Sequence, residues 1–165
     1  MSATIDTLEQ LQALYGVPHE RSLRKELTYL SAPYQALVAA SPFVVLATHG
    51  PDGLDCSPRG DAPGFVRILD EHTLLLPDRP GNNRIDSLRN IIHDPHVALL
   101  FLIPGVGESF RVNGRATISL EPELLALCEA QGKLPRSVLR ISVDTCYFQC
   151  SKAVSYTHLT LPTNR

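Results

Sequence analysis

The apolar segments of this chain are short and follow one another through tight turns, and this spacing most constrains its fold. FVVLAT at 43–48 is apolar and rich in β-branched residues, which predicts a buried strand, and HGPDG at 49–53 predicts a turn into a pairing strand. The predicted strands span residues 43–48, 54–57, 65–69, 73–76, 97–103 and 109–119, and the segments 137–143 and 146–149 together give the final strand material. Six or seven strands with few helices between them favour hairpins and a small antiparallel barrel over a doubly wound parallel sheet.

Helical patterns flank these strands, so the predicted class is mainly β with added helices, an α+β fold. DTLE at 6–9 resembles a capping box and opens one helix, and Ser31 opens a second with Pro33 in its first turn. Further helices are predicted over about 83–92 and from about 119 to 132. NG at 113–114 interrupts the longest strand and predicts a β-bulge there.

Composition narrows the class of protein. The 165 residues suit one domain, and the net charge of −2 gives no general attraction to nucleic acid or membranes. Twelve of the fifteen basic residues are arginine, which suits bidentate phosphate binding but equally fits a GC-rich genome. With no signal-peptide pattern and no apolar run of membrane-spanning length, we expect a cytoplasmic protein that neither spans a membrane nor binds nucleic acid.

The four cysteines do not form a typical metal-binding pattern. Cys146 and Cys150 have no His or Cys pair at finger-like spacing, and His93 and His96 occur in HDPH, which is typical of a turn. We therefore expect reduced thiols, some of them buried, and no metal site.

Three segments mix arginine with Gly, Pro or Asn at strand edges and loops: 57–66, 76–84 and 110–115. In a compact barrel such edges can converge on one mouth, where guanidinium groups and helix N-terminal amides would bind a phosphate. The alternative is that Asn82, Asn83 and Arg84 only cap the following helix, while Arg59 and Arg111 form surface ion pairs. We favour a ligand site because three such segments occur in one small domain.

Four longer motifs in these segments resemble a known family. They are PRGDAPGFV at 58–66, LLPDRPGNNRIDSLRN at 75–90, LLFLIPG at 99–105 and RVNGRA at 111–116. Together they resemble the pyridoxamine 5′-phosphate oxidase-related, FMN-binding split-barrel family, most closely a small bacterial branch of it. The resemblance implies a split barrel over residues 43–153, a helical segment at 1–42 packing on it, and a homodimer with FMN between the subunits.

The resemblance also implies which residues hold the cofactor. Asn83 and Arg84 match the FMN phosphate position, and backbone groups from two segments would line the isoalloxazine ring. The complete predicted set is Arg59, Asp61, Phe65, Val66, Leu76, Pro77, Asp78, Arg79, Asn82, Asn83, Arg84, Ser87, Arg111 and Asn113.

The chain departs from the vitamin-making oxidases near its end. It has no C-terminal Arg-x-His element, and residues 154–165, VSYTHLTLPTNR, resemble translated adapter sequence. We therefore predict an FMN-dependent oxidoreductase acting on another small molecule, with a nicotinamide as one candidate electron donor. The alternatives are a non-catalytic flavin carrier or sensor, and a split barrel for a deazaflavin or a tetrapyrrole-like ligand. No catalytic residue is predicted, because the flavin itself carries the chemistry.

Overall fold

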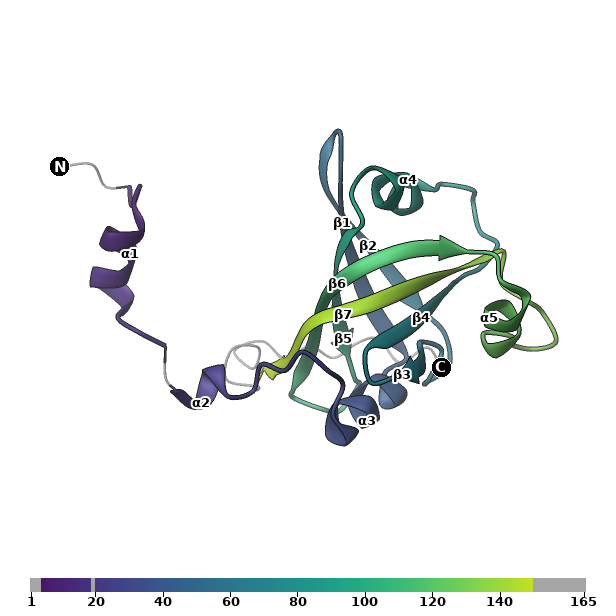
Figure 1. The fold of residues 1–165 in the computed structure, drawn as a ribbon, viewed down its shortest axis with the longest axis horizontal. Coiled ribbons are helices and arrows are strands. Elements are labelled where there is room, and N and C mark those ends of the chain that lie inside the picture. The colour runs from purple at the N-terminus through teal and green to yellow at the C-terminus, as the bar shows by residue number, and fades with distance from the viewer. Residues whose placement is uncertain (1–3, 19, 150–165) are drawn as a thin grey trace.

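The computed structural model describes residues 4–18 and 20–149, which form a curled antiparallel sheet with helices at its margins (Figure 1). The helices are α1 (Leu8–Tyr15), α2 (Glu20–Leu23), α3 (Ala32–Ala40), α4 (Asp86–His93) and α5 (Pro122–Leu127). The strands are β1 (Phe43–Gly50), β2 (Gly53–Gly60), β3 (Arg67–Asp70), β4 (Thr73–Asp78), β5 (His96–Leu102), β6 (Ser109–Ser119) and β7 (Ser137–Gln149). In the described residues these seven strands form one sheet in the order β2-β1-β5-β6-β7-β4-β3. This confirms the predicted mainly β split barrel with flanking helices.

The core lies inside the curled sheet, because alternate residues of each strand point inward. On β1, Val44 and Leu46 are fully buried, whereas their neighbours Val45 and Ala47 are partly exposed on the outer face. The same alternation on the other long strands buries Leu99, Phe101, Phe110, Val112 and Ile141. Tyr34 and Val38 of α3 join this core cluster.

The predicted bulge is present where β6 pairs with β7. Asn113 pairs with Thr145 but Gly114 pairs with Val143, so Asp144 is the extra residue and it belongs to β7. The bulge also explains why the sequence of β7 reads as two segments, although the structure has one continuous strand.

Several element boundaries differ from the predictions. β3 begins at Arg67 rather than at Phe65, and β4 continues to Asp78 rather than ending at Leu76. β2 continues to Gly60, so Pro58 and Arg59 belong to a strand rather than to a loop. α4 begins at Asp86 rather than near residue 83, and α5 ends at Leu127 rather than near residue 132. The loop from 79 to 85 is therefore irregular along its whole length.

The N-terminal region contacts the barrel mainly through α3 and the segment before it. Leu27 exchanges two backbone hydrogen bonds with Cys146, of 2.9 and 2.7 Å, and the Tyr34 hydroxyl donates to the Lys25 carbonyl oxygen at 2.6 Å. By contrast, α1 buries no residue and lies apart from the barrel (Figure 1). The predicted domain boundaries stay predictions, and the adapter-like tail at 154–165 lies outside the described residues. None of the described helices has the length and apolar character needed to cross a membrane.

α4 is held against β1 by a close backbone approach. A Cβ atom on Gly50 would lie 2.0 Å from the Asn90 Oδ1 atom, so only glycine leaves room for the Asn90 side chain there. Asn90 Nδ2 in turn donates to the Thr48 hydroxyl at 3.1 Å. These contacts hold α4 against the end of β1.

Candidate functional site

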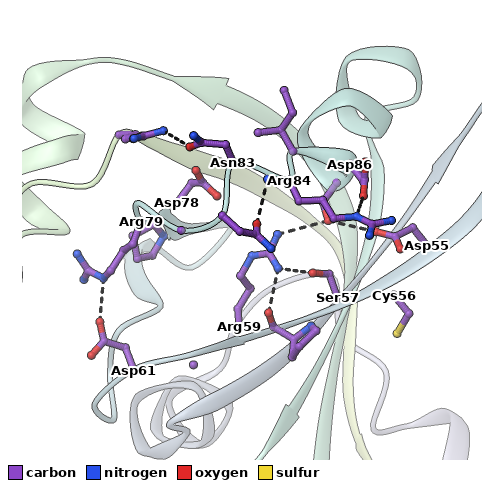
Figure 2. Close-up of a pocket in the computed structure, with 18 of the residues that line it drawn as sticks. Asp55, Cys56, Ser57, Arg59, Asp61, Asp78, Arg79, Asn83, Arg84 and Asp86 are labelled. Carbon is purple, nitrogen blue, oxygen red and sulfur yellow. Dashed lines mark hydrogen bonds and ion pairs between the residues drawn. The ribbon is translucent and has the colours of Figure 1, made fainter.

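A cleft of about 470 Å³ opens between β2, the first turn of α4 and the loop from 79 to 85 (Figure 2). It is lined by Asp55, Cys56, Ser57, Pro58, Arg59, Gly60, Asp61, Phe65, Pro77, Asp78, Arg79, Gly81, Asn82, Asn83, Arg84, Ile85, Asp86, Ser87 and Arg136. Its volume lies within the range of small-molecule sites, about 300–1,000 Å³.

β2 presents one polar residue at every second position. Asp55, Ser57 and Arg59 are half-buried and alternate with exposed neighbours, as the two-residue period of a strand requires. The Arg59 guanidinium donates to the Ser57 hydroxyl, to the Pro58 carbonyl oxygen at 2.9 Å and to the Ser87 hydroxyl at 3.3 Å. Arg59 is therefore directed from β2 toward the beginning of α4.

The first turn of α4 has no side-chain cap. Ile85 occupies the N-cap position, and its side chain cannot accept a hydrogen bond from the helix amides. Ser87, in the first turn, is 3% exposed, and its hydroxyl donates to Asp55 Oδ2 at 3.3 Å. The helix thus presents its partly positive N-terminal end at the wall of the cleft.

The loop before α4 is shaped by two asparagines. Asn82 Oδ1 accepts a hydrogen bond from the Arg84 amide at 3.0 Å, which closes a turn of the Asx type. Asn83 adopts the left-handed region with φ of 61°, a conformation that asparagine tolerates better than most residues. Arg136 Nη1 donates to Asn83 Oδ1 at 2.6 Å and so ties this loop to the segment before β7.

Arg79 and Arg84 leave the loop in different directions (Figure 2). Arg79 Nε donates to Asp61 Oδ2 at 2.8 Å, and Arg79 Nη2 donates to the Cys128 carbonyl oxygen at 3.3 Å. Arg84 Nε donates to Asp86 Oδ2 at 2.5 Å, and this hydrogen bond, together with the charge of Asp86, raises the pKa of Arg84 above its usual value. Arg79 thus anchors the end of α5, whereas Arg84 stays beside the first turn of α4.

The charges that line the cleft balance. Arg59, Arg79, Arg84 and Arg136 face four aspartates, Asp55, Asp61, Asp78 and Asp86. Arg79 and Arg84 donate to carboxylates, whereas the hydrogen bonds of Arg59 and Arg136 run to neutral oxygens. Guanidinium groups, two hydroxyls and a helix N-terminus together form a donor set suited to an anionic group.

A family model described as pyridoxamine 5′-phosphate oxidase matches residues 30–150 of this sequence. The chain belongs to the pyridoxamine 5′-phosphate oxidase family. This confirms the resemblance at the family level, while the assignment to a particular bacterial branch stays a prediction. No curated protein matches the sequence significantly.

Solved structures share the fold of this family member. HupZ of Group A Streptococcus aligns with a TM-score of 0.59 at 19% identity, over 73% of this chain and 94% of that one. A candidate pyridoxamine 5′-phosphate oxidase of Lactobacillus delbrueckii aligns with a TM-score of 0.57 at 20% identity, over 74% and 98%. The General Stress Protein 26 of Bacillus anthracis aligns with a TM-score of 0.53 at 17% identity, over 69% and 88%. At these identities the likeness concerns the fold alone.

The cleft brings together most of the residues predicted for the cofactor site. They are Arg59, Asp61, Phe65, Pro77, Asp78, Arg79, Asn82, Asn83, Arg84 and Ser87. Val66 and Leu76 are 2% and 1% exposed and their side chains belong to the core, so only their backbone could face a ligand.

Arg111 and Asn113 are not part of this cleft within one chain. Both lie on the outer, exposed face of β6, where Asn113 Nδ2 donates to the Thr145 hydroxyl at 3.2 Å. The Arg111 guanidinium lies 5.9 Å from the Tyr147 ring centre. Within one chain these two residues therefore do not contribute to the cleft.

Four lining residues with polar roles were missing from the predicted set: Asp55, Ser57, Asp86 and Arg136. Asp86 lies within the motif at 75–90, but its role depends on the pair that it forms with Arg84. Asp55 and Ser57 could have been found from the alternation that starts at Arg59, once this stretch is recognised as a strand. Arg136 gives no local pattern, because its contact to Asn83 joins positions 53 residues apart.

Proposed function

We propose that this protein binds FMN in the cleft and acts as a cytoplasmic FMN-dependent oxidoreductase on a small molecule. The observation that carries the proposal is the convergence of Arg59 and Arg84, from β2 and from the loop before α4, on the uncapped first turn of that helix. Membership of the pyridoxamine 5′-phosphate oxidase family supports a flavin as the ligand.

The donor set of the cleft fits the phosphate end of FMN. Guanidinium groups can bind phosphate oxygens through paired hydrogen bonds, and backbone amides at a helix N-terminus favour negative charge. Arg59, Arg84 and the first turn of α4 would hold the phosphate, with Ser57 and Ser87 supplying hydroxyl donors. Arg136 would act indirectly, because it fixes the conformation of Asn83.

The ring of the flavin would lie along β4. Leu76, Pro77 and Asp78 pair with β7 on one side, but the pairing with β3 on the other side ends at Leu75. This leaves a stretch of strand edge beside Phe65, which also lines the cleft. Backbone groups and one aromatic side chain are the kind of surface that orients a flat polar ring.

When bound, FMN would supply the hydride and electron transfer itself. The residues of this chain would bind the phosphate, orient the ring and limit access of water from the β2 side. The described residues offer no arranged nucleophile and base that would indicate a different reaction. We therefore assign no catalytic side chain.

We further propose that the protein is a homodimer with FMN at the subunit interface. The outer face of the sheet carries an apolar patch in which paired residues lie in register, Phe43 with Leu102, Val45 with Leu100 and Ala47 with Ala98. Burial of such a patch against a second copy would remove apolar area from water. Arg111 and Asn113 lie on the neighbouring strand β6 and would reach the partner's cleft from this face.

Replacement of Arg84 by alanine tests the phosphate assignment. Loss of a charge-assisted hydrogen bond costs about 1.5–3 kcal/mol, which weakens binding at least about tenfold. We expect Arg84→Ala to weaken FMN binding to this extent, as measured by quenching of flavin fluorescence. Riboflavin, which lacks the phosphate, should bind the variant and the wild type equally.

Arg89→Ala provides the matched control, because Arg89 lies on the exposed side of α4 and does not line the cleft. Its FMN affinity should equal that of the wild type. An Arg84→Ala variant with unchanged FMN affinity would show that this residue does not hold the phosphate. Turnover of NADH or NADPH with an added electron acceptor then separates an oxidoreductase from a non-catalytic flavin carrier.

A further inference from the structure

Asp86 places a negative charge where the proposed function places a phosphate. Its Oδ2 atom lies 2.5 Å from Arg84 Nε, and Asp86 is the first residue of α4, directly after the N-cap residue Ile85. The Asp86 carboxylate therefore meets both features that favour an anion here, the Arg84 guanidinium and the helix N-terminus.

We propose that Asp86 is an internal competitor of the phosphate, which engages Arg84 in the ligand-free protein and must release it when the anion binds. This inference rests on the proposed function of the cleft and concerns how its affinity is set. A phosphate beside Asp86 would lie close to a like charge, which disfavours binding as long as the carboxylate keeps its position.

The exposure of this ion pair supports a competitor rather than a permanent structural pair. The Arg84 and Asp86 side chains are 79% and 44% exposed, so both can rearrange without disrupting the core. Exposed ion pairs contribute little to stability, so the pair can exchange partners at small cost. The second nearby carboxylate, Asp55, accepts a hydrogen bond from Ser87 and adds to the negative field at Arg84.

A positioning role for Asp86 would change FMN affinity in the opposite direction when Asp86 is removed. If Asp86 served to position Arg84 for the phosphate, its removal would weaken FMN binding. If it competes, its removal frees a guanidinium and a helix end and strengthens binding. The direction of the change therefore separates the two roles.

Asp86→Asn is the decisive variant, with Asp52→Asn as the matched control at the exposed turn between β1 and β2. We expect Asp86→Asn to bind FMN about threefold more tightly than the wild type, as loss of one exposed ion pair implies. Riboflavin affinity should stay constant, and Asp52→Asn should change neither affinity. Asp86→Glu keeps the charge and should bind FMN as the wild type does.

Two additional measurements keep the result independent of folding and of FMN itself. Asp86→Ser is measured beside Asp86→Asn, with thermal melting of each, so that the conclusion does not depend on one replacement. Inorganic phosphate should raise the melting temperature of Asp86→Asn more than that of the wild type. As a separate test, Asp86→Asn in an Arg84→Ala background should gain less FMN affinity than in the wild type, because the guanidinium that the substitution would free is absent.

The proposal is overturned if Asp86→Asn and Asp86→Ser, both folded, bind FMN with unchanged or weaker affinity. It is also overturned if Asp52→Asn produces the same gain, since the effect would then reflect net charge alone. If neither wild type nor variant binds FMN, yet phosphate stabilises Asp86→Asn more strongly, the competition stands and the proposed flavin function fails.

Discussion

Asp94 lies at the end of α4 between two histidines from neighbouring strands. Its carboxylate accepts hydrogen bonds from the His96 amide at 3.1 Å, from His96 Nδ1 at 2.7 Å and from His49 Nδ1 at 3.1 Å. These hydrogen bonds, first those from the His96 backbone and side chain and then that from His49, lower the pKa of Asp94 to about 2. One residue thus joins β1, β5 and the end of α4.

The lowered pKa predicts how this contact depends on pH. A carboxylate with a lowered pKa in the folded state stabilises the fold above its ordinary value of 3.8, and this contribution is lost as the pH falls through about 2. We expect Asp94→Asn to unfold at lower urea concentration than the wild type at pH 7. The difference should shrink as the pH falls below 4. A difference that stays constant down to pH 2 would contradict this role, and Asp52→Asn controls for the loss of one surface charge.

The individual residues of the site were predictable to different degrees. Arg59, Arg84 and Ser87 could be named because their motifs resemble a family, and because arginine beside a helix start favours phosphate. Asp86 belongs to one of these motifs, but its ion pair with Arg84 depends on where α4 begins. Arg136 could not be predicted, since only the folded chain brings it to Asn83.

Among the elements, the junction of β6 and β7 leaves little room for change, because the obstacle there is backbone rather than a side chain. A Cβ atom on Gly114 would lie 2.1 Å from the Ser142 carbonyl oxygen, which belongs to a backbone that cannot easily move. The extra residue Asp144 next to this position bends β7 and brings the two backbones together.

We therefore expect Gly114→Ala to destabilise the protein by about 1–3 kcal/mol, the usual cost of overpacking. The free energy of unfolding from urea titration measures this change. Gly81→Ala is the matched control, because a Cβ there meets no atom within 4 Å. If the two variants were equally stable, the close approach at the bulge would not constrain this sheet.

Two prolines directly follow strand ends that the sequence predicted too early, at residues 57 and 76. The predicted strand ended at Ser57, yet Pro58 pairs with Val45 within β2. β2 is an edge strand, where a missing amide proton is tolerated. Pro77 likewise lies in β4 beyond the last residue that pairs with β3. For both prolines, the position of the strand in the sheet decides whether proline is tolerated. A local sequence pattern does not reveal that position.

For the whole molecule, the short strands and their turns were enough to predict the split barrel. They could not predict how two chains would associate. Arg111 and Asn113 were predicted to join the site, and within one chain they lie on the outer face of β6. Their sequence motif is local, but a site between subunits depends on how two surfaces meet. The proposed homodimer is the arrangement in which these residues would reach a cleft.

A charge introduced into the apolar outer face tests this arrangement. Leu100 lies in the middle of the patch and pairs with Val45, so Leu100→Lys should prevent association by leaving a buried, unpaired charge in the interface. Light scattering should give the mass of two chains for the wild type and of one chain for the variant. Leu120→Lys, at a residue that is 68% exposed before α5, should keep the wild-type mass. A wild-type protein with the mass of a single chain would contradict the proposed homodimer.

We propose above all that the cleft beside the first turn of α4 binds FMN. Titration of the purified wild-type protein with FMN, followed by flavin fluorescence and absorbance, tests it most directly. We expect saturable quenching with one FMN per chain and a yellow protein after removal of free ligand. A colourless protein that leaves the fluorescence of added FMN unchanged would contradict it.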